Sequence, residues 1–530
     1  VAASRMAVMH TLRWAGEALH QHLSLALVFF IVILATRYFF RQRHHKLPPG
    51  PWGFPVVGYL PFFDNDIFKT LLNLKGRFGS IYRVSFGTQS VVVLADPEVI
   101  REAFKKEEFH HRPKGTLFDI FEGYGLLNTT GVLWKDQRRF LHEKLRGLGM
   151  KTTGTGREKL EARIMSEVKC LLHYLASGNG KAIDVEEVLC NALTNVICIL
   201  LMSVRFKPHN PHFTRFMELY DEGFKLFLKC NIACYIPACR YIPSVNQNIK
   251  KLMQNREESC DMIKSIINHR RETFDPEMTR DILDSYLLEE HRAKEEGRVV
   301  YDGLDFDRQL TQVMTDMFSA GEETVKTCLM WSFVFLLRHP EVMKRVQEEL
   351  DAVVGRLRMP SLEDQQHLPY TEATICEVLR RSSLVPLGTF HATSRTTTLG
   401  GYTIPENTTV IPLLYACHMD SKQWDNPEGF DPTRFIDSEG GVKKPKQFMP
   451  FGIGRRICLG QVLARSELFL FFTSILHVFD VALPEGEPLP SMEGDMATTY
   501  SPKPFKVSFI QRDPAENVTP RPYVFRGAGL

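Results

Sequence analysis

Residues 451–460 read Phe451-Gly452-Ile453-Gly454-Arg455-Arg456-Ile457-Cys458-Leu459-Gly460, and an apolar, helix-like run extends from Gln461 to Phe472. The glycines permit a tight turn and a close approach of the backbone to a flat ligand. They also place successive N–H groups near the sulfur, and a helix that begins just after the cysteine directs its positive end to the same place. Arg456 can grip a carboxylate in bidentate fashion. The segment therefore favours a thiolate at Cys458 beside a carboxylate-bearing ligand; a glycine-rich turn around an ordinary buried cysteine is the alternative.

The other cysteines carry no comparable signal. The chain has eleven, an odd number, without CxxC or zinc spacing, and most lie in apolar runs such as residues 196–200. Buried free thiols in a reducing compartment account for them. The composition, 44% hydrophobic and 24% charged, is that of an ordinary globular protein. The net charge of +3 gives no reason to expect a nucleic acid as partner.

The front of the chain predicts a membrane anchor. Residues 23–40 are almost wholly apolar, and at about 1.5 Å per residue they reach roughly the thickness of the hydrocarbon core. A cleaved signal peptide, the alternative, would have a shorter apolar region. Basic residues after the span favour a cytosolic position for the rest of the chain, and the proline-rich residues 47–53 form a stiff spacer. We expect a short lumenal segment (1–22), an anchor (23–40), a linker (41–53) and a catalytic domain (54–530).

The remainder predicts a mostly α-helical fold with small β-sheets. Residues 81–94 are rich in β-formers and interrupted at Gly87, which indicates a hairpin. From Trp134 to about Gln365 the pattern is mainly helical, and short strands are expected around residues 396–411. We expect a single large domain, because widely separated motifs must converge on one ligand.

One predicted helix carries a chemical signal. Apolar residues at 310, 313, 314, 317 and 318 form one face and lead into residues 320–324, Ala-Gly-Glu-Glu-Thr, with helical pattern up to Pro340. Glu323 beside Thr324 can relay protons, and a local distortion would open room for water. A glycine inside a helix, Gly321, implies close packing or a ligand beside the backbone. Taken alone, an apolar helix face of this kind more often packs in the hydrophobic core than lines an active site.

Residues 451–460 resemble the haem-binding signature of the cytochrome P-450 superfamily, and the resemblance extends over about residues 48–510. It implies a haem-thiolate monooxygenase fold behind the transmembrane helix. The cofactor would be haem b (iron protoporphyrin IX), with Cys458 as the axial ligand whose electron donation favours O–O cleavage. Glu323 and Thr324 would be catalytic. The family often has a second hydroxyl residue after the threonine, where this chain has Val325.

The resemblance also implies roles for other residues. Glu377, Arg380 and Arg434 would form a buried network under the haem. Further residues match haem or propionate contacts: Phe451, Gly454, Arg456, Gly460, Trp134, Arg138, Arg112 and His391. Others match positions that face substrate: Phe118, Phe121, Ala320, Val385, Leu387 and Thr499.

The partners implied by the family are an electron donor and a membrane. Electrons from NADPH would arrive through a flavin-containing NADPH–cytochrome reductase, with cytochrome b5 as a second donor, and dioxygen would be consumed. The reductase would dock on the cysteine side, where Lys443, Lys444, Lys446 and Arg455 supply positive charge; plain solvation of these side chains is the alternative. The protein would be a single-pass protein of the endoplasmic reticulum membrane with a cytosolic catalytic domain and a lipophilic small-molecule substrate.

Two segments resemble a particular group of enzymes within the superfamily. Residues 49–62 and 468–494 resemble arthropod ecdysteroid 26-hydroxylases, enzymes that inactivate moulting hormone by oxidising the end of its side chain. An ecdysteroid 25-hydroxylase, or a monooxygenase of another lipophilic substrate, is the nearest alternative. A haem-thiolate isomerase or dehydratase that needs no reductase is a different class, but such enzymes often lack the acid–threonine pair present here. A non-catalytic haem carrier or sensor is a third.

Overall fold

The computed structural model describes residues 46–115, 121–151, 153–154, 156–207, 210–301 and 303–512, together with His22 and Phe29. The expected lumenal segment (1–22) and anchor (23–40) fall outside the described residues except for these two positions. So do residues 41–45 of the linker and the expected substrate contact Phe118. Those expectations stay predictions.

Helices make up most of the described chain, and the expected mostly α-helical class is confirmed. They are α2 (Ile67–Phe78), α3 (Pro97–Lys105), α4 (Gly131–Gly147), α5 (Arg157–Ser177), α6 (Val185–Met202), α7 (Pro211–Cys230), α8 (Ile232–Tyr235), α9 (Pro243–Glu272), α10 (Ile282–Glu295), α11 (Phe306–Arg338), α12 (Pro340–Val353), α13 (Pro369–Ser382), α14 (Leu414–Met419) and α15 (Gln461–Val478). Several begin at an acidic cap: Asp305 accepts a hydrogen bond from the N–H of Arg308 at the start of α11, and Asp184 accepts one from the N–H of Glu186 at the start of α6.

The strands of the described residues are short and form four small sheets. They are β1 (Ile81–Phe86), β2 (Gln89–Leu94), β3 (Ala182–Asp184), β4 (His391–Ala392), β5 (Thr397–Leu399), β6 (Tyr402–Ile404), β7 (Thr409–Pro412), β8 (Phe479–Ala482), β9 (Gly494–Met496), β10 (Tyr500–Pro502) and β11 (Lys506–Gln511). The sheet orders are β1-β2-β7-β4, β3-β11-β8, β9-β10 and β5-β6. The hairpin expected at residues 81–94 is confirmed as β1 and β2, with Phe86 opposite Gln89 across the turn.

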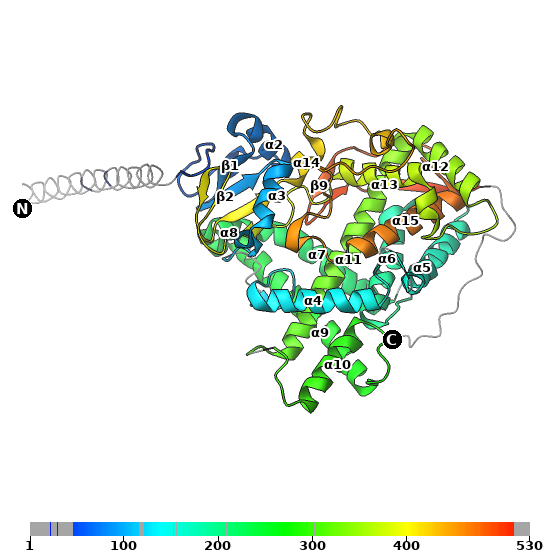
Figure 1. The fold of residues 1–530 in the computed structure, drawn as a ribbon, viewed down its shortest axis with the longest axis horizontal. Coiled ribbons are helices and arrows are strands. Elements are labelled where there is room, and N and C mark those ends of the chain that lie inside the picture. Colours follow the sequence, from blue (N-terminus) through cyan, green and yellow to red (C-terminus); the bar gives the residue numbers. More distant parts are fainter. Residues whose placement is uncertain are drawn as a thin grey trace, which may run out of the picture.

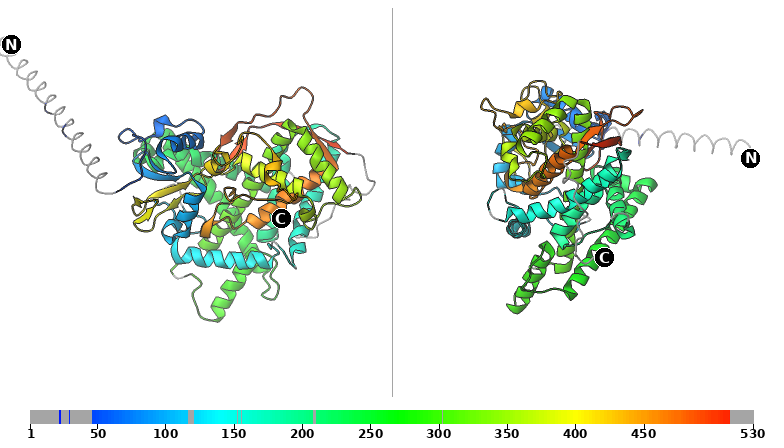
Figure 2. Two further views of the ribbon diagram at one scale, coloured as in Figure 1. Left: turned by 45° about the horizontal axis from the view of Figure 1, so that its top comes forward. Right: turned by 90° about the vertical axis from the view of Figure 1, so that its right-hand side faces the viewer.

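The β1–β2 end of the molecule, with α2 and α3, lies to one side of the helical part (Figure 1). Helix α4 runs along the helical part, and α9 and α10 extend beyond it. The two further views show the same separation between the strand-rich end and the helices (Figure 2). The widest sheet combines β1 and β2 with β7 and β4 from far along the chain, which brings His391 to this end.

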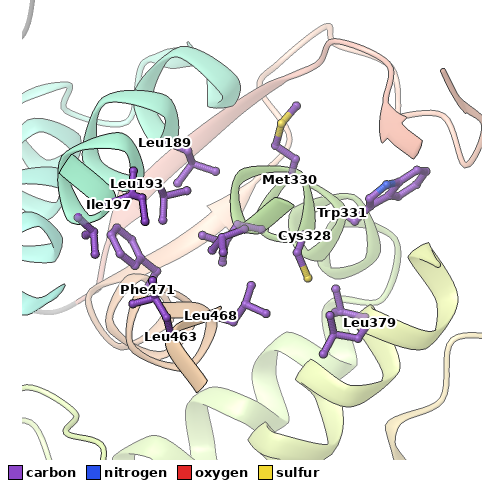
Figure 3. Packing of buried hydrophobic residues seen from close by; sticks show 14 of the residues in the cluster. Leu189, Leu193, Ile197, Cys328, Met330, Trp331, Leu379, Leu463, Leu468 and Phe471 are labelled. Atoms are coloured by element: carbon purple, nitrogen blue, oxygen red, sulfur yellow. The ribbon is translucent and has the colours of Figure 1, made fainter. Parts of the chain in front are cut away.

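Helix α11 is the centre of the hydrophobic core. Figure 3 shows Cys328 of α11 directed toward Leu379 of α13 and Leu468 of α15, with Leu189, Leu193 and Ile197 of α6 on another side of the helix. Among the described residues, α6 is the one helix long and apolar enough to cross a membrane, yet 72% of that stretch is buried within the protein, as in a core helix.

Gly321 serves close packing, which is one of the two roles expected for it. A Cβ atom built at Gly321 would lie 2.9 Å from Cδ1 of Ile197 in α6. The glycine therefore lets α6 approach α11 closely. The local distortion expected in this helix is not seen: α11 is continuous α-helix from Phe306 to Arg338.

Candidate functional site

Cys458 lies in the turn just before α15 and is the only exposed cysteine of the eleven. Its backbone N–H donates to the carbonyl of Phe451 at 3.0 Å, which closes the turn. Although the side chain is reachable by solvent, protein surrounds it closely enough that desolvation raises the pKa of the Cys458 thiol. The N–H of Gly460 and the charge of Arg138 act in the opposite direction. The Gly460 N–H and the Arg138 charge thus favour the thiolate, and a bound cation would favour it further.

Gly454 shapes this turn. Its φ is +80°, and an added Cβ would lie 2.9 Å from the carbonyl oxygen of Phe104 in α3. A side chain there would be strained by the backbone conformation and would also press on α3. Gly460, by contrast, has no neighbour within 4 Å of such a Cβ and acts here through its N–H.

Three arginines converge on this turn and donate hydrogen bonds to backbone carbonyls. Arg456 donates to the carbonyls of His110 and Thr129, at 3.0 and 2.6 Å, and Arg138 donates to the carbonyl of Ile457. Arg112 donates to the carbonyl of Leu127 at 2.8 Å.

Among the described residues, none of these arginines forms an ion pair with a carboxylate. Burial, together with the charges of Arg112 and Arg138, lowers the pKa of Arg456 to about 8. Burial and the charge of Arg138 lower the pKa of Arg112 to about 10. Bound anions would offset the mutual repulsion of these charges and stabilise the cluster.

Two aromatic residues complete the cationic cluster. Trp134 is buried in α4, and the guanidinium of Arg456 lies 3.8 Å from the centre of its ring, so the indole supports the arginine. His391 of β4 is buried; its Nδ1 lies 2.7 Å from the carbonyl of Phe109 and its ring stacks on Phe104. Burial and the charges of Arg112 and Arg456 hold the pKa of His391 well below its usual value.

This donor set fits haem. An accessible thiol is available as a metal ligand, and guanidinium groups without carboxylate partners are available for two propionates. No three His, Cys, Asp or Glu side chains of the described residues are grouped as a metal site. Bound haem would supply the redox chemistry of dioxygen, while Cys458, Arg112, Arg138, Arg456 and His391 hold and orient it.

The acid–alcohol pair lies in the middle of α11. Ala320 is exposed and Thr324 is half-buried, although most of this helix is buried, so the rest of the protein encloses neither side chain. The hydroxyl of Thr324 donates to the carbonyl of Ala320 at 3.0 Å. The carboxylate of Glu323 instead accepts from the hydroxyl of Thr499 at 2.9 Å and pairs with Lys326 at 3.0 Å. No hydrogen bond of the described residues joins Glu323 to Thr324, so the expected relay requires movement of Glu323.

The residues expected to form an ion-pair network are in contact. Both carboxylate oxygens of Glu377 accept from Arg380, at 2.7 and 2.8 Å, and Arg434 donates to one of them at 3.1 Å. Glu377 and Arg380 are fully buried. Arg380 also donates to the carbonyls of His418 and Pro427, so the network fastens α13 to the segment before the cysteine turn.

The other expected residues have weaker structural support. Phe451 is half-buried, with the guanidinium of Arg465 4.9 Å from its ring centre, and the guanidinium of Arg256 lies 5.6 Å from the ring centre of Phe121. Val385 and Leu387 are half-buried in the loop between α13 and β4. Thr499 is expected to contact the substrate, but its hydroxyl donates a hydrogen bond to Glu323.

Sequence reasoning missed polar residues of α11. Asp316 accepts from the N–H groups of Leu126 and Leu127, at 2.7 and 2.9 Å, and Gln309 accepts from that of Gly125 at 2.9 Å. They fasten the loop before α4 to α11. Lys326 was also missed. The signal available was a polar or charged residue within an otherwise apolar helical stripe.

Comparison with known proteins identifies the family. Residues 48–509 match the sequence profile described as "Cytochrome P450". The chain is 47% identical to "Cytochrome P450 18a1" of Drosophila melanogaster, over 95% of this chain and 94% of that protein. It is 33% identical to "Cytochrome P450 2B4" of Oryctolagus cuniculus, over 89% and 95% of the two chains. It is 34% identical to "Cytochrome P450 2D6" of Homo sapiens, over 92% and 98%.

Proposed function

Because this chain belongs to the cytochrome P450 family of haem-thiolate monooxygenases, we propose that it uses NADPH and dioxygen to hydroxylate ecdysteroids at C-26 of the side chain. The accessible thiol at Cys458 beside an arginine cluster without carboxylate partners supports the oxygen chemistry. The substrate assignment rests on the resemblance of residues 49–62 and 468–494 to arthropod ecdysteroid 26-hydroxylases. Greater identity to the insect protein, 47%, than to the rabbit and human proteins, 33% and 34%, agrees with it.

The second of these segments ends close to the acid of α11. Gly494, its last residue, pairs with Pro502 in the β9–β10 sheet. The same sheet region carries Thr499, which donates to Glu323. A substrate-specific sequence in this segment would therefore lie within reach of the catalytic region.

Electron delivery from a membrane-bound reductase is part of the proposal. Lys443, Lys444, Lys446 and Arg455 are exposed near the cysteine turn. Lys444 also pairs with Glu372 at 2.8 Å, whereas the other three are available to an acidic partner surface. Raised salt should weaken this docking, because it screens exposed charges.

Attachment to the endoplasmic reticulum is supported by apolar surface next to the expected anchor. Trp52, Phe54, Val56 and Phe62 are all exposed, and the rings of Phe54 and Phe62 stack 5.4 Å apart. A contiguous exposed aromatic group is unusual on a soluble monomer and suits a bilayer surface. The adjoining expected anchor would hold this surface at the membrane.

The test is incubation of the purified protein with 20-hydroxyecdysone, reductase and NADPH under labelled dioxygen. The proposal predicts a product that carries one labelled oxygen, located at C-26 by mass-spectrometric fragmentation. Label at C-25 would support the alternative hydroxylase, and no oxygen gain would contradict the ecdysteroid assignment. A product formed equally well without reductase and NADPH would instead indicate an isomerase or dehydratase.

A further inference from the structure

A cavity of about 440 Å³ is formed mainly by α5, α6 and α7. The described residues that line it include none assigned to haem and neither Glu323 nor Thr324. Its volume falls within the range of roughly 300–1,000 Å³ that is typical of small-molecule pockets. Apolar side chains form part of its wall: Leu171, Val188, Ala192, Phe213 and Met217. The cavity therefore has the size and the apolar walls of a small-molecule site, apart from the cysteine turn.

The charged groups at this cavity are mostly carboxylates. Its described lining has two cations, Arg205 and Lys326, against six acids: Glu167, Asp184, Glu186, Glu187, Glu218 and Asp221. Lys326 also pairs with Glu323 at 3.0 Å and with Glu322 at 3.1 Å, neither of which lines the cavity. The local potential is therefore negative, and it attracts a cationic ligand and repels an anionic one.

Three of these carboxylates already have partners within the protein. Glu167 pairs with Arg205 at 2.8 Å, and Glu186 pairs with Lys326 at 3.4 Å. Asp184 accepts a hydrogen bond from the N–H of Glu186 and so caps α6. These acids are held by the fold, so a ligand would find its counter-charge elsewhere in the cavity.

Asp221 of α7 differs from these three acids. It is half-buried, and within the described parts of the chain its carboxylate accepts no hydrogen bond and forms no ion pair. Burial raises the pKa of Asp221, and the charge of Glu323 adds to this rise. The positive charges of Lys326 and Lys225 act in the opposite direction. A partly desolvated carboxylate without a partner costs free energy, which a bound cation would offset.

The position of Asp221 on α7 also sets the direction of a ligand. Phe213, Met217 and Asp221 follow one another at intervals of four residues, so they lie along one face of the helix. All three line the cavity. At about 1.5 Å per residue, the first and the last of them are roughly 12 Å apart along the helix axis. An elongated ligand can therefore place a charged end at Asp221 while its apolar body contacts the other two.

We propose that this cavity binds a lipophilic organic cation, with its ammonium group at Asp221 and its apolar body along Met217 and Phe213. The ligand class is that of elongated alkyl or aralkyl ammonium ions. A neutral molecule of the same shape lacks the charge pair with Asp221, and an anion meets the repulsion of the surrounding carboxylates. This site goes beyond the proposed function, because none of its contacts depends on a steroid or on turnover.

The first test uses octyltrimethylammonium as the probe, because its quaternary nitrogen has no lone pair and cannot bind haem iron. We expect saturable uptake of this cation by the ferric haem protein in equilibrium dialysis. The neutral 1-octanol and the anionic octyl sulfate should bind roughly tenfold more weakly or worse, since they lack the charge pair. Uptake of either one as tight as that of the cation overturns the proposal.

The second test removes the counter-charge. Asp221→Asn, which is nearly isosteric, should weaken binding of the probe by roughly tenfold or more. The matched control is Glu222→Gln, which removes the next carboxylate of the same helix, a partner of Lys251 and Asn255 that does not line the cavity. It should bind the probe like the wild type. Equal affinity in Asp221→Asn and the wild type, or an equal loss in Glu222→Gln, contradicts the proposal.

A third test fills the cavity and leaves every carboxylate in place. Val188→Trp puts a large side chain where the apolar body of the ligand would lie, and we expect it to lose binding of the probe. Binding at the haem site instead would change the ferric Soret band and persist in both variants, and such persistence overturns the proposal. If Val188→Trp yields no haem protein, Asp221→Asn decides. If neither variant does, the preference of the wild type for the cation decides.

Discussion

At the scale of single residues, Thr324 is the side chain best placed to pass protons from α11. Its hydroxyl donates to the carbonyl of Ala320, and its side chain is half-buried. We expect Thr324→Ala to bind carbon monoxide like the wild type but to lose product per NADPH by roughly tenfold or more, with peroxide released instead. Thr324→Ser, which keeps the hydroxyl, is the control. Normal coupling in Thr324→Ala would remove this residue from the proton path.

Gly454 allows a second test at the residue scale. Gly454→Ala should be destabilised by about 1–2 kcal/mol from the positive φ alone, and further by the contact with Phe104. Gly452→Ala is matched, because its φ is +71° but no atom lies within 4 Å of the added Cβ. The measurement is haem retention during denaturant unfolding of each variant. Equal losses in the two variants would show that the approach of α3 is unimportant.

The site residues differ in how far the sequence could reveal them. Cys458 and Arg456 lie in one short motif, and its residue types alone indicate a thiolate beside a carboxylate-bearing ligand. The convergence of Arg112 and Arg138 on the same turn depends on the fold, and only the family resemblance pointed to them. Lys326 gave a local signal, a charge in an apolar stretch, but its three carboxylate partners come partly from α6.

At the scale of elements, the Glu377 network holds α13 to the chain that precedes the cysteine turn. Glu377→Gln would leave Arg380 fully buried without a counter-charge, and we expect a loss of about 3–5 kcal/mol. The control is Glu428→Gln, which removes a 68% exposed carboxylate that pairs with Arg381 of α13, and should cost under about 1 kcal/mol. Denaturant unfolding followed by haem absorbance measures both. Similar losses of unfolding free energy in the two variants would contradict a special role for the buried network.

Local sequence patterns predicted the individual helices and strands better than they predicted which of these elements pair or pack together. The hairpin of β1 and β2 and the start of α15 follow from residue types and turn signals within a few positions. The parallel pairing of β2 with β7, which sets Val91 opposite Thr409, joins segments more than 300 residues apart, and no local pattern encodes it. The sequence could not decide between the two roles of Gly321 for the same reason, because Ile197 lies on another helix.

At the scale of the whole molecule, buried histidines should make the protein sensitive to acid. Burial and the charge of Arg380 lower the pKa of His418 to about 3, and burial with the charge of Arg356 lowers the pKa of His477 to about 4. The unfolded chain takes up protons at these residues below about pH 6.5, whereas the folded protein does not. The stability that these neutral histidines contribute is therefore fully present above about pH 6.5 and is lost as the pH falls toward the folded values.

The expected loss for His418 between pH 7 and pH 5 is about 2 kcal/mol. His418→Gln, which cannot titrate, should lose correspondingly less stability over this range, although it starts from a lower value at pH 7. Denaturant unfolding at the two pH values measures the difference, with the exposed His291→Gln as control. An identical pH dependence in wild type and His418→Gln would show that this histidine is not held neutral by the fold.

The proposed monooxygenase chemistry requires that the sulfur of Cys458 bind haem iron, and the carbon monoxide difference spectrum of the reduced protein tests this most directly. The wild type should show the red-shifted Soret band of a thiolate-ligated haem. Cys458→Ser should lose it, while Cys239→Ser, at a half-buried cysteine of the turn after α8, should keep it. A Cys458→Ser protein that retained the red-shifted band would contradict the assignment.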